Sequence, residues 1–213
     1  MNNFRYKTIT FSGVDGAGKS TVIDILKKEL ELMDLNIIQM RSRPQILPIL
    51  SSFKYGKNNA EKIATDSLPR QGSNKSNLSS FLRFSYYYLD YILGQLYFSF
   101  KYRGNNNVIL YDRYYFDYII DPKRANISIN KNLIKFLYLF IKKPDLNFFL
   151  YAPAEEIFKR KKELDKETIT ELTNEYILLF SELNLNKNRY FVINNISLDY
   201  SISSILKKIR DIL

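Results

Sequence analysis

The segment Gly13–Ser20 constrains the fold more than any other part of this 213-residue chain. It matches the complete Walker A pattern, Gly-x-x-x-x-Gly-Lys-Ser/Thr. An apolar run at residues 8–11 precedes it, and a helical run that begins near Lys19 follows it, with apolar side chains at the spacing of one helix face. A strand, a glycine-rich loop and a helix in this order predict a phosphate-binding loop.

The chemistry of such a loop follows from its geometry. Its glycines allow successive backbone N–H groups to face an anion, and the dipole of the next helix adds to the attraction. We expect Lys19 to reach the β- and γ-phosphates of ATP and the Ser20 hydroxyl to bind Mg²⁺. The complete motif in this context favours nucleotide binding over a glycine-rich turn that binds nothing. The residues expected around the ATP phosphates are Gly13, Asp15, Gly16, Ala17, Gly18, Lys19, Ser20 and Thr21.

A second apolar run, at residues 108–111, ends in a carboxylate, Asp112. A strand that ends in aspartate is weak evidence alone, because aspartate is common in turns. In open α/β sheets, however, ligands bind beyond the carboxyl ends of the strands. We therefore expect Asp112 to lie near Ser20 and to complete the Mg²⁺ site.

The chain contains neither cysteine nor histidine. This excludes disulfides, zinc sites of the Cys/His type and every catalytic dyad that depends on histidine. Any metal must be a hard cation held by oxygen ligands, which again indicates Mg²⁺.

The formal net charge is +10, which favours anionic partners. A polyphosphate ligand is favoured over nucleic acid, because no RNP-type motif or basic–aromatic repeat is present. The polar N-terminus does not resemble a signal peptide. Charged residues interrupt the most apolar region, residues 81–102, so no membrane span is expected. We expect a soluble, cytoplasmic protein.

Short apolar runs alternate with helical patterns along the chain, as is typical of an α/β fold with a parallel sheet. We expect one P-loop NTPase domain over residues 1–213, with about five mainly parallel strands flanked by helices. The strands are predicted at residues 7–12, 36–41, 108–111, 146–151 and 190–193. The helices are predicted at residues 19–33, 78–102, 132–141, 154–163, 167–183 and 200–212. Residues 45–77 are expected to form a mobile loop with a short helix, and residues 121–131 a surface excursion.

These motifs resemble those of the thymidylate kinase family of nucleoside monophosphate kinases. Residues 11–21 look like that family's version of Walker A, with its acidic Asp15, and Asp112-Arg113-Tyr114 looks like its Asp-Arg-Tyr motif. Pro144-Asp145-Leu146 and the strand after it resemble the segment that leads into the family's LID. The likeness extends over nearly the whole chain and is strongest at the two phosphate motifs.

The resemblance implies a core sheet, an acceptor-binding region and a short LID at about residues 153–170. In the family, the counterpart of Asp15 contacts the acceptor's sugar hydroxyl, and the counterpart of Arg113 contacts the acceptor phosphate. Gly16 stands where some relatives place an arginine, so the LID should supply the cation from Arg160, Lys161 or Lys162. Lys19, Asp112, Arg113 and Arg160 are the expected catalytic residues.

The acceptor side departs from the family. Relatives usually read Arg-Glu-Pro after the second strand, whereas this chain reads Ser42-Arg43-Pro44. Tyr88, Leu89 and Tyr91 replace an Asp-Arg pair and a glutamine on the long middle helix. Core packing or a dimer interface is the favoured explanation for these tyrosines, ahead of substrate contact. The candidate substrate contacts are Asp15, Arg83, Tyr91, Arg113, Tyr114 and Asp117.

Three functions remain open. The first is an ATP- and Mg²⁺-dependent kinase that phosphorylates a nucleoside monophosphate, dTMP by default. The second is a kinase of the same fold that acts on a sugar or surface-glycan hydroxyl, with Asp15, Asp112 or Asp117 as the base. The third is an NTP-binding or nucleic-acid-binding module without kinase activity. By analogy with the family, a homodimer through residues 78–102 is expected.

Overall fold

The computed structural model describes residues 6–48, 50, 76–102, 106–185 and 188–213. It contains a five-stranded, entirely parallel sheet in the order β2-β3-β1-β4-β5. The predicted α/β class and the predicted sheet are confirmed. Most of the segment expected to form a mobile loop with a short helix lies outside the described residues. The strands are β1 (Lys7–Ser12), β2 (Asn36–Arg41), β3 (Asn107–Asp112), β4 (Leu146–Tyr151) and β5 (Tyr190–Asn194).

The register of the central strands brings the two phosphate motifs to one edge of the sheet. β1 lies between β3 and β4, and Phe11 of β1 is paired with Asp112 of β3. Both strands are buried along nearly their whole length, as expected for strands covered on both faces. The loop after β1 and the carboxylate that ends β3 therefore emerge side by side.

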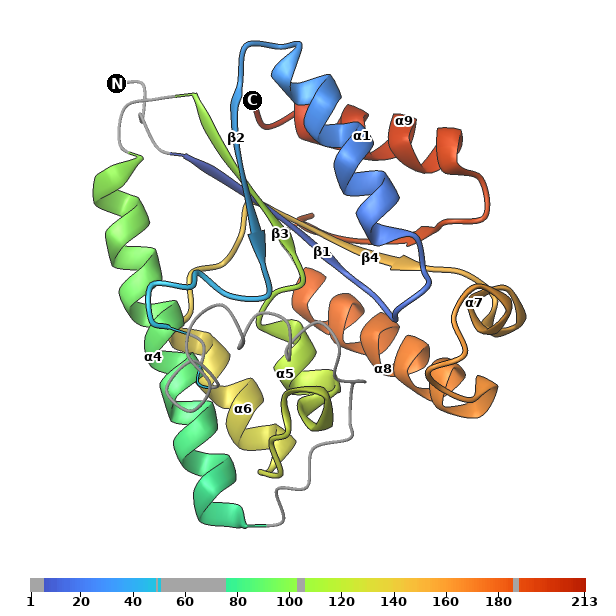
Figure 1. Cartoon of the computed structure of the whole chain (residues 1–213). Coiled ribbons are helices and arrows are strands. Elements are labelled where there is room, and N and C mark those ends of the chain that lie inside the picture. Colours follow the sequence, from blue (N-terminus) through green and yellow to red (C-terminus); the bar gives the residue numbers. More distant parts are fainter. Residues whose placement is uncertain (1–5, 49, 51–75, 103–105, 186–187) are drawn as a thin grey trace.

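Helices cover both faces of the sheet (Figure 1). Helices α1 (Lys19–Glu31) and α9 (Leu198–Arg210) pack on one face, where an aliphatic core forms with the strands. The other face carries α4 (Asn77–Lys101), α5 (Phe116–Ile120), α6 (Lys131–Leu137) and α8 (Lys166–Asn184) over an aromatic core. Helix α7 (Ala154–Arg160) lies beyond the end of β4 (Figure 1).

Three predicted segments differ from the structure. The helix expected at residues 154–163 ends at Arg160, because Lys161 adopts an extended conformation. The helix expected at residues 132–141 is a short α6 followed by a 3₁₀ turn, η2 (Tyr138–Phe140). The expected surface excursion begins with another 3₁₀ turn, η1 (Pro122–Ala125), and its first residues are buried.

The tyrosine-rich helix α4 packs against α5 through its aromatic rings. The ring of Tyr91 lies edge-on to those of Tyr114, Tyr115 and Tyr118, at centroid distances of 5.3, 5.5 and 6.2 Å. Such edge-to-face contacts stabilise the core beyond simple burial.

The opposite side of α4 carries an exposed apolar stripe. Successive members of this stripe lie three, four or seven residues apart. The exposed fractions of their side chains lie between 43% and 74%. This spacing is typical of a helix that packs against another helix. The stripe consists of Leu78, Leu82, Leu89, Leu93, Leu96 and Phe100. Within the described part of the chain, no helix combines the length and hydropathy that a membrane span requires.

Candidate functional site

The loop between β1 and α1 is shaped by its glycines and braced by β4 and β5. A Cβ on Gly13 would lie 2.3 Å from the carbonyl oxygen of Leu150, so no larger residue fits there. Gly18 has φ +86°, a conformation that favours glycine. Asn195, which follows β5, donates from Nδ2 to the carbonyl of Ala17 at 2.8 Å. The loop is therefore held in place before any ligand binds.

Lys19 lies over its own loop. Its Nζ donates to the carbonyls of Gly13 at 2.9 Å and Val14 at 3.0 Å, and its side chain is only 6% exposed. Burial, assisted by the nearby Arg113 cation, lowers the pKa of Lys19 to about 7. The ammonium is thus confined beside the loop in which a phosphate would bind.

Asp112 carries a carboxylate oxygen that the described residues leave unsatisfied. Its Oδ1 is buried and has no hydrogen-bond partner in this part of the chain. Such an oxygen is costly to bury unless a ligand uses it. Ser20 lies exposed in the first turn of α1. Mg²⁺ commonly binds one or two protein oxygens together with substrate phosphates, so this pair fits the ion.

Arg113 is the fixed centre of the polar network. It directly follows β3 and lies in the left-handed region, with φ +76°. Its Nη1 donates to Asp117 Oδ1 at 2.7 Å and to the carbonyl of Gly13 at 3.2 Å, and its Nη2 donates to Asp15 Oδ1. Burial opposes the charge, but the ionised Asp117 and Asp15 hold the pKa of Arg113 well above its usual range. Strained backbone of this kind is concentrated at functional sites.

Asp117 is saturated with donors. Besides Arg113, its carboxylate accepts from the hydroxyl of Tyr176 at 2.5 Å and from the backbone N–H of Tyr114 at 3.3 Å. Tyr176 belongs to α8 and is fully buried, and burial raises the pKa of its hydroxyl, as does the nearby Asp117. Sequence patterns carry no signal for Tyr176, because it lies 59 residues from its partner.

Asp15 is held between two arginines. Arg113 donates to Oδ1, and Nη1 of Arg124 donates to Oδ2. Burial would raise the pKa of Asp15, but the charges of Arg113, Lys19 and Arg124 prevail and hold it well below the usual range. Arg124 was not among the predicted site residues. Its only signal was its place in a charged stretch, and the 3₁₀ turn that directs it toward the loop could not be predicted.

Of the three cations predicted to act from a LID, Arg160 makes a hydrogen bond to the loop. Its Nη1 lies 3.5 Å from the carbonyl oxygen of Gly16. Lys161 forms an ion pair with Glu163 at 2.9 Å, and Lys162 is exposed. A Cβ on Gly16 would approach Ile157 of α7 to 3.3 Å, so α7 packs directly on the loop.

The other candidate substrate contacts are not gathered around the loop. The hydroxyl of Tyr91 donates to the carbonyl of Ser42, and that of Tyr114 donates to the carbonyl of Lys142 at 2.8 Å. Both hydroxyls therefore donate to backbone carbonyls and not toward the loop. Arg83 lies half-buried on α4, and its buried Nε has no hydrogen-bond partner among the described residues.

Arg43, which stands where thymidylate kinases usually have a glutamate, makes structural contacts within the fold. It forms a buried ion pair with Asp90 of α4 at 2.7 Å. Asp90 also accepts the backbone N–H groups of Gln45 at 2.9 Å and Leu47 at 2.6 Å. This pair fixes the segment after β2 against α4.

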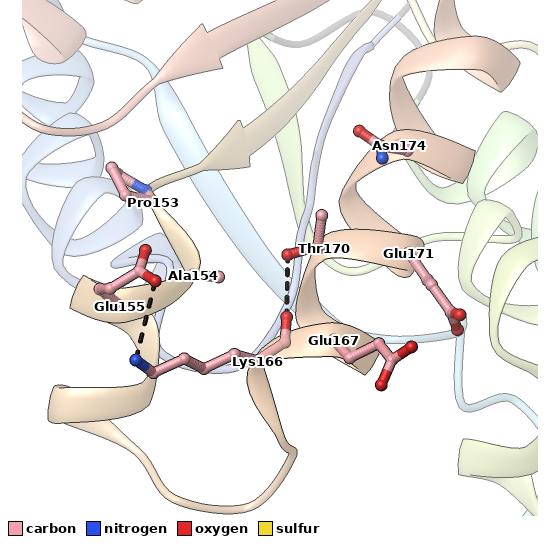
Figure 2. A pocket seen from close by; sticks show the side chains of 8 residues that line it. All are labelled: Pro153, Ala154, Glu155, Lys166, Glu167, Thr170, Glu171 and Asn174. Atoms are coloured by element: carbon pink, nitrogen blue, oxygen red, sulfur yellow. Dashed lines mark hydrogen bonds and ion pairs between the residues drawn. The ribbon is translucent and has the colours of Figure 1, made fainter.

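A hollow of about 480 Å³ lies between α7 and α8. Figure 2 shows its lining, in which Lys166 pairs with Glu155 while Glu167 and Glu171 add two carboxylates. The negative charge of this lining would repel a phosphate. The nucleotide site is therefore expected at the loop after β1 and not in this hollow.

A parallel sheet, a Walker A loop after its central strand and a carboxylate at the end of the adjacent strand define a P-loop kinase-like fold. Thymidylate kinases have the same fold. The thymidylate kinase of Candida albicans is similar with a TM-score of 0.65 over 97% of this chain and 92% of that chain, at 21% sequence identity. That of Ehrlichia chaffeensis gives a TM-score of 0.59 over 97% of this chain and 99% of that chain, at 16% identity. No protein-family model matches the sequence.

Proposed function

We propose that this protein is an ATP- and Mg²⁺-dependent phosphotransferase that moves the γ-phosphoryl group onto a small acceptor bearing a phosphate, with dTMP as the default. One observation carries the proposal. Lys19, the unsatisfied oxygen of Asp112 and the arginine pair on Asp15 all lie at one edge of the sheet.

The donor site uses the loop and its flanking side chains. On binding ATP, Lys19 exchanges its bonds to two loop carbonyls for bonds to the β- and γ-phosphates. The Ser20 hydroxyl and the Asp112 carboxylate would hold Mg²⁺, which would neutralise part of the phosphate charge. Arg160, already at the carbonyl of Gly16, supplies a further cation as charge spreads over the transferred group.

The state of the carboxylates favours a phosphate acceptor over a hydroxyl acceptor. A hydroxyl must lose a proton to a base, whereas a phosphate oxygen is already ionised. Asp15 is bound by two arginines that depress its pKa, and Asp117 receives three donors. Both carboxylates are therefore already occupied by hydrogen-bond donors of the protein. Asp112 Oδ1 has no hydrogen-bond partner among the described residues, but that oxygen belongs to the proposed metal site.

A LID over residues 153–170 would cover the donor. Its first helix, α7, packs on Gly16 through Ile157. Closure of such a segment excludes water and so limits wasteful hydrolysis of ATP.

An ADP-release screen with Mg-ATP tests the proposal. The panel contains dTMP, other nucleoside monophosphates, sugar phosphates, nucleosides and sugars, and Lys19→Ala serves as the inactive control. Its breadth is warranted because broad substrate specificity is attributed to the Candida albicans thymidylate kinase. We expect turnover with at least one phosphate-bearing acceptor and loss of that turnover in Lys19→Ala. Turnover with a sugar or glycan hydroxyl alone would contradict the proposed acceptor class.

A further inference from the structure

Two arginines from one short segment converge on a single carboxylate. Arg113 directly follows β3, and Arg124 lies in the 3₁₀ turn η1, yet each donates to a different oxygen of Asp15. Two guanidinium groups directed at one oxyanion are the arrangement by which proteins bind carboxylates and phosphates. In this structure the oxyanion between them is supplied by the protein itself.

The two arginines are held very differently. Arg113 is 9% exposed and has further bonds to Asp117 and the Gly13 carbonyl, so it stays in place whether or not Asp15 remains. Arg124 is 25% exposed, and the ion pair with Asp15 is its only hydrogen-bonded side-chain contact among the described residues. Arg124 can therefore exchange one anion for another without disturbing the core.

Asp15 can also move away from the two arginines without losing all contact with a cation or with water. Its carboxylate lies 3.9 Å from Nζ of Lys19, the next cation along the loop. Its side chain is 16% exposed, so water can reach it. An incoming anion that replaced it would leave the charge balance around the two arginines nearly unchanged, which avoids the cost of an uncompensated buried cation.

We propose that Arg124 is a specificity-determining residue that, together with Arg113, clamps the phosphate of the acceptor, and that Asp15 occupies this clamp until the acceptor binds. The proposal rests on the proposed function and extends it, because it assigns the anion-binding role to a particular second arginine. Release of Asp15 by the acceptor frees its carboxylate to accept a hydrogen bond from an acceptor hydroxyl.

A purely structural role for Arg124 makes a different prediction. If Arg124 only braces Asp15, its removal lowers stability but leaves the affinity for a free anion unchanged. If Arg124 binds the acceptor anion, its removal weakens anion binding even in a variant that remains folded.

The test is a calorimetric titration of inorganic phosphate into the protein after the loop has been saturated with Mg-ADP. The variants are Arg124→Gln and the matched control Lys123→Gln, which removes an exposed cation from the same turn. We expect phosphate to bind the wild-type complex, Arg124→Gln to weaken this binding at least about tenfold, and Lys123→Gln to change it by less than about twofold. Retained affinity for Mg-ADP shows that each variant is folded.

Two results would overturn the proposal. One is equal phosphate affinity in wild type and Arg124→Gln, and the other is absence of phosphate binding to the wild-type complex. Failure of the proposed function appears separately, as failure of Mg-ADP to bind. In that case the phosphate titration is repeated in a Lys19→Ala background, where the loop lysine no longer contributes and Arg124→Gln still reports on the clamp alone.

Discussion

The hydroxyl of Tyr176 donates to Asp117 Oδ1 at 2.5 Å, and the same oxygen accepts from Arg113 at 2.7 Å. Tyr176 belongs to α8, whose first residues lie within the proposed LID, whereas Arg113 belongs to the proposed acceptor site. Through Asp117, this bond therefore connects the helix that begins in the proposed LID to the arginine that we expect to bind the acceptor.

Tyr176→Phe removes only this hydroxyl. We expect the free energy of unfolding to fall by about 1 kcal/mol and the KM for the acceptor to rise several-fold, because Arg113 loses part of its support. The KM for ATP should not change. Tyr190→Phe is the control, since it removes a hydroxyl that is paired with Tyr138 at 3.0 Å in the same core. Equal kinetic effects of both variants would show that the position of Arg113 does not depend on Tyr176.

Loss of the buried Asp90 should destabilise the fold. Asp90→Ala leaves Arg43 buried without its counter-ion and two backbone N–H groups without their acceptor. We expect urea denaturation to show a loss of about 3–5 kcal/mol. The double variant Arg43→Met/Asp90→Leu should recover much of this loss, because it removes both charges. A loss below about 1 kcal/mol in Asp90→Ala would contradict the buried ion pair.

The pKa of Asp15 predicts how pH affects stability. Its folded-state pKa is depressed, so the ionised form stabilises the native state above the unfolded-state pKa of about 4 and this contribution is lost as the pH falls. We expect wild type to exceed Asp15→Asn by about 2–3 kcal/mol between pH 5.5 and 8. The difference should shrink below about pH 4. A difference that grows on acidification would mean that the arginines do not stabilise the ionised form.

The apolar stripe on α4 predicts self-association. Leu89, Leu93 and Leu96 form its centre, and we expect a homodimer in which this stripe contacts its copy. Light scattering after size exclusion should give twice the chain mass for wild type and the chain mass for Leu93→Glu. Leu178→Glu, on an exposed position of α8, is the control and should remain dimeric. A monomeric wild type at micromolar concentration would exclude this interface.

Local patterns were sufficient to predict the framework of the fold. All five strands were predicted to within about a residue, because each is a short run rich in apolar residues that turn signals separate from the helical patterns. The Walker A loop was found because its chemistry needs fixed residues at fixed spacing. Asp112 was found because a strand end is a local feature.

The missed parts of the candidate site depend on contacts between distant segments. Tyr176 meets Asp117, and Arg43 meets Asp90, only because α8 and α4 pack on the same face of the sheet. Arg124 reaches Asp15 through a 3₁₀ turn in a segment that was expected to be exposed. No periodicity or spacing encodes such pairs, because tertiary packing decides them.

The most direct test of the central claim is ³¹P NMR of a reaction that contains the protein, Mg-ATP and dTMP. The proposed activity predicts consumption of the γ-phosphate signal of ATP and growth of two coupled signals from a new diphosphate, with neither change in Lys19→Ala. If dTMP is inert, the other phosphate-bearing acceptors of the panel follow. A new phosphate monoester formed on a hydroxyl acceptor, or consumption of ATP to inorganic phosphate alone, would contradict the account.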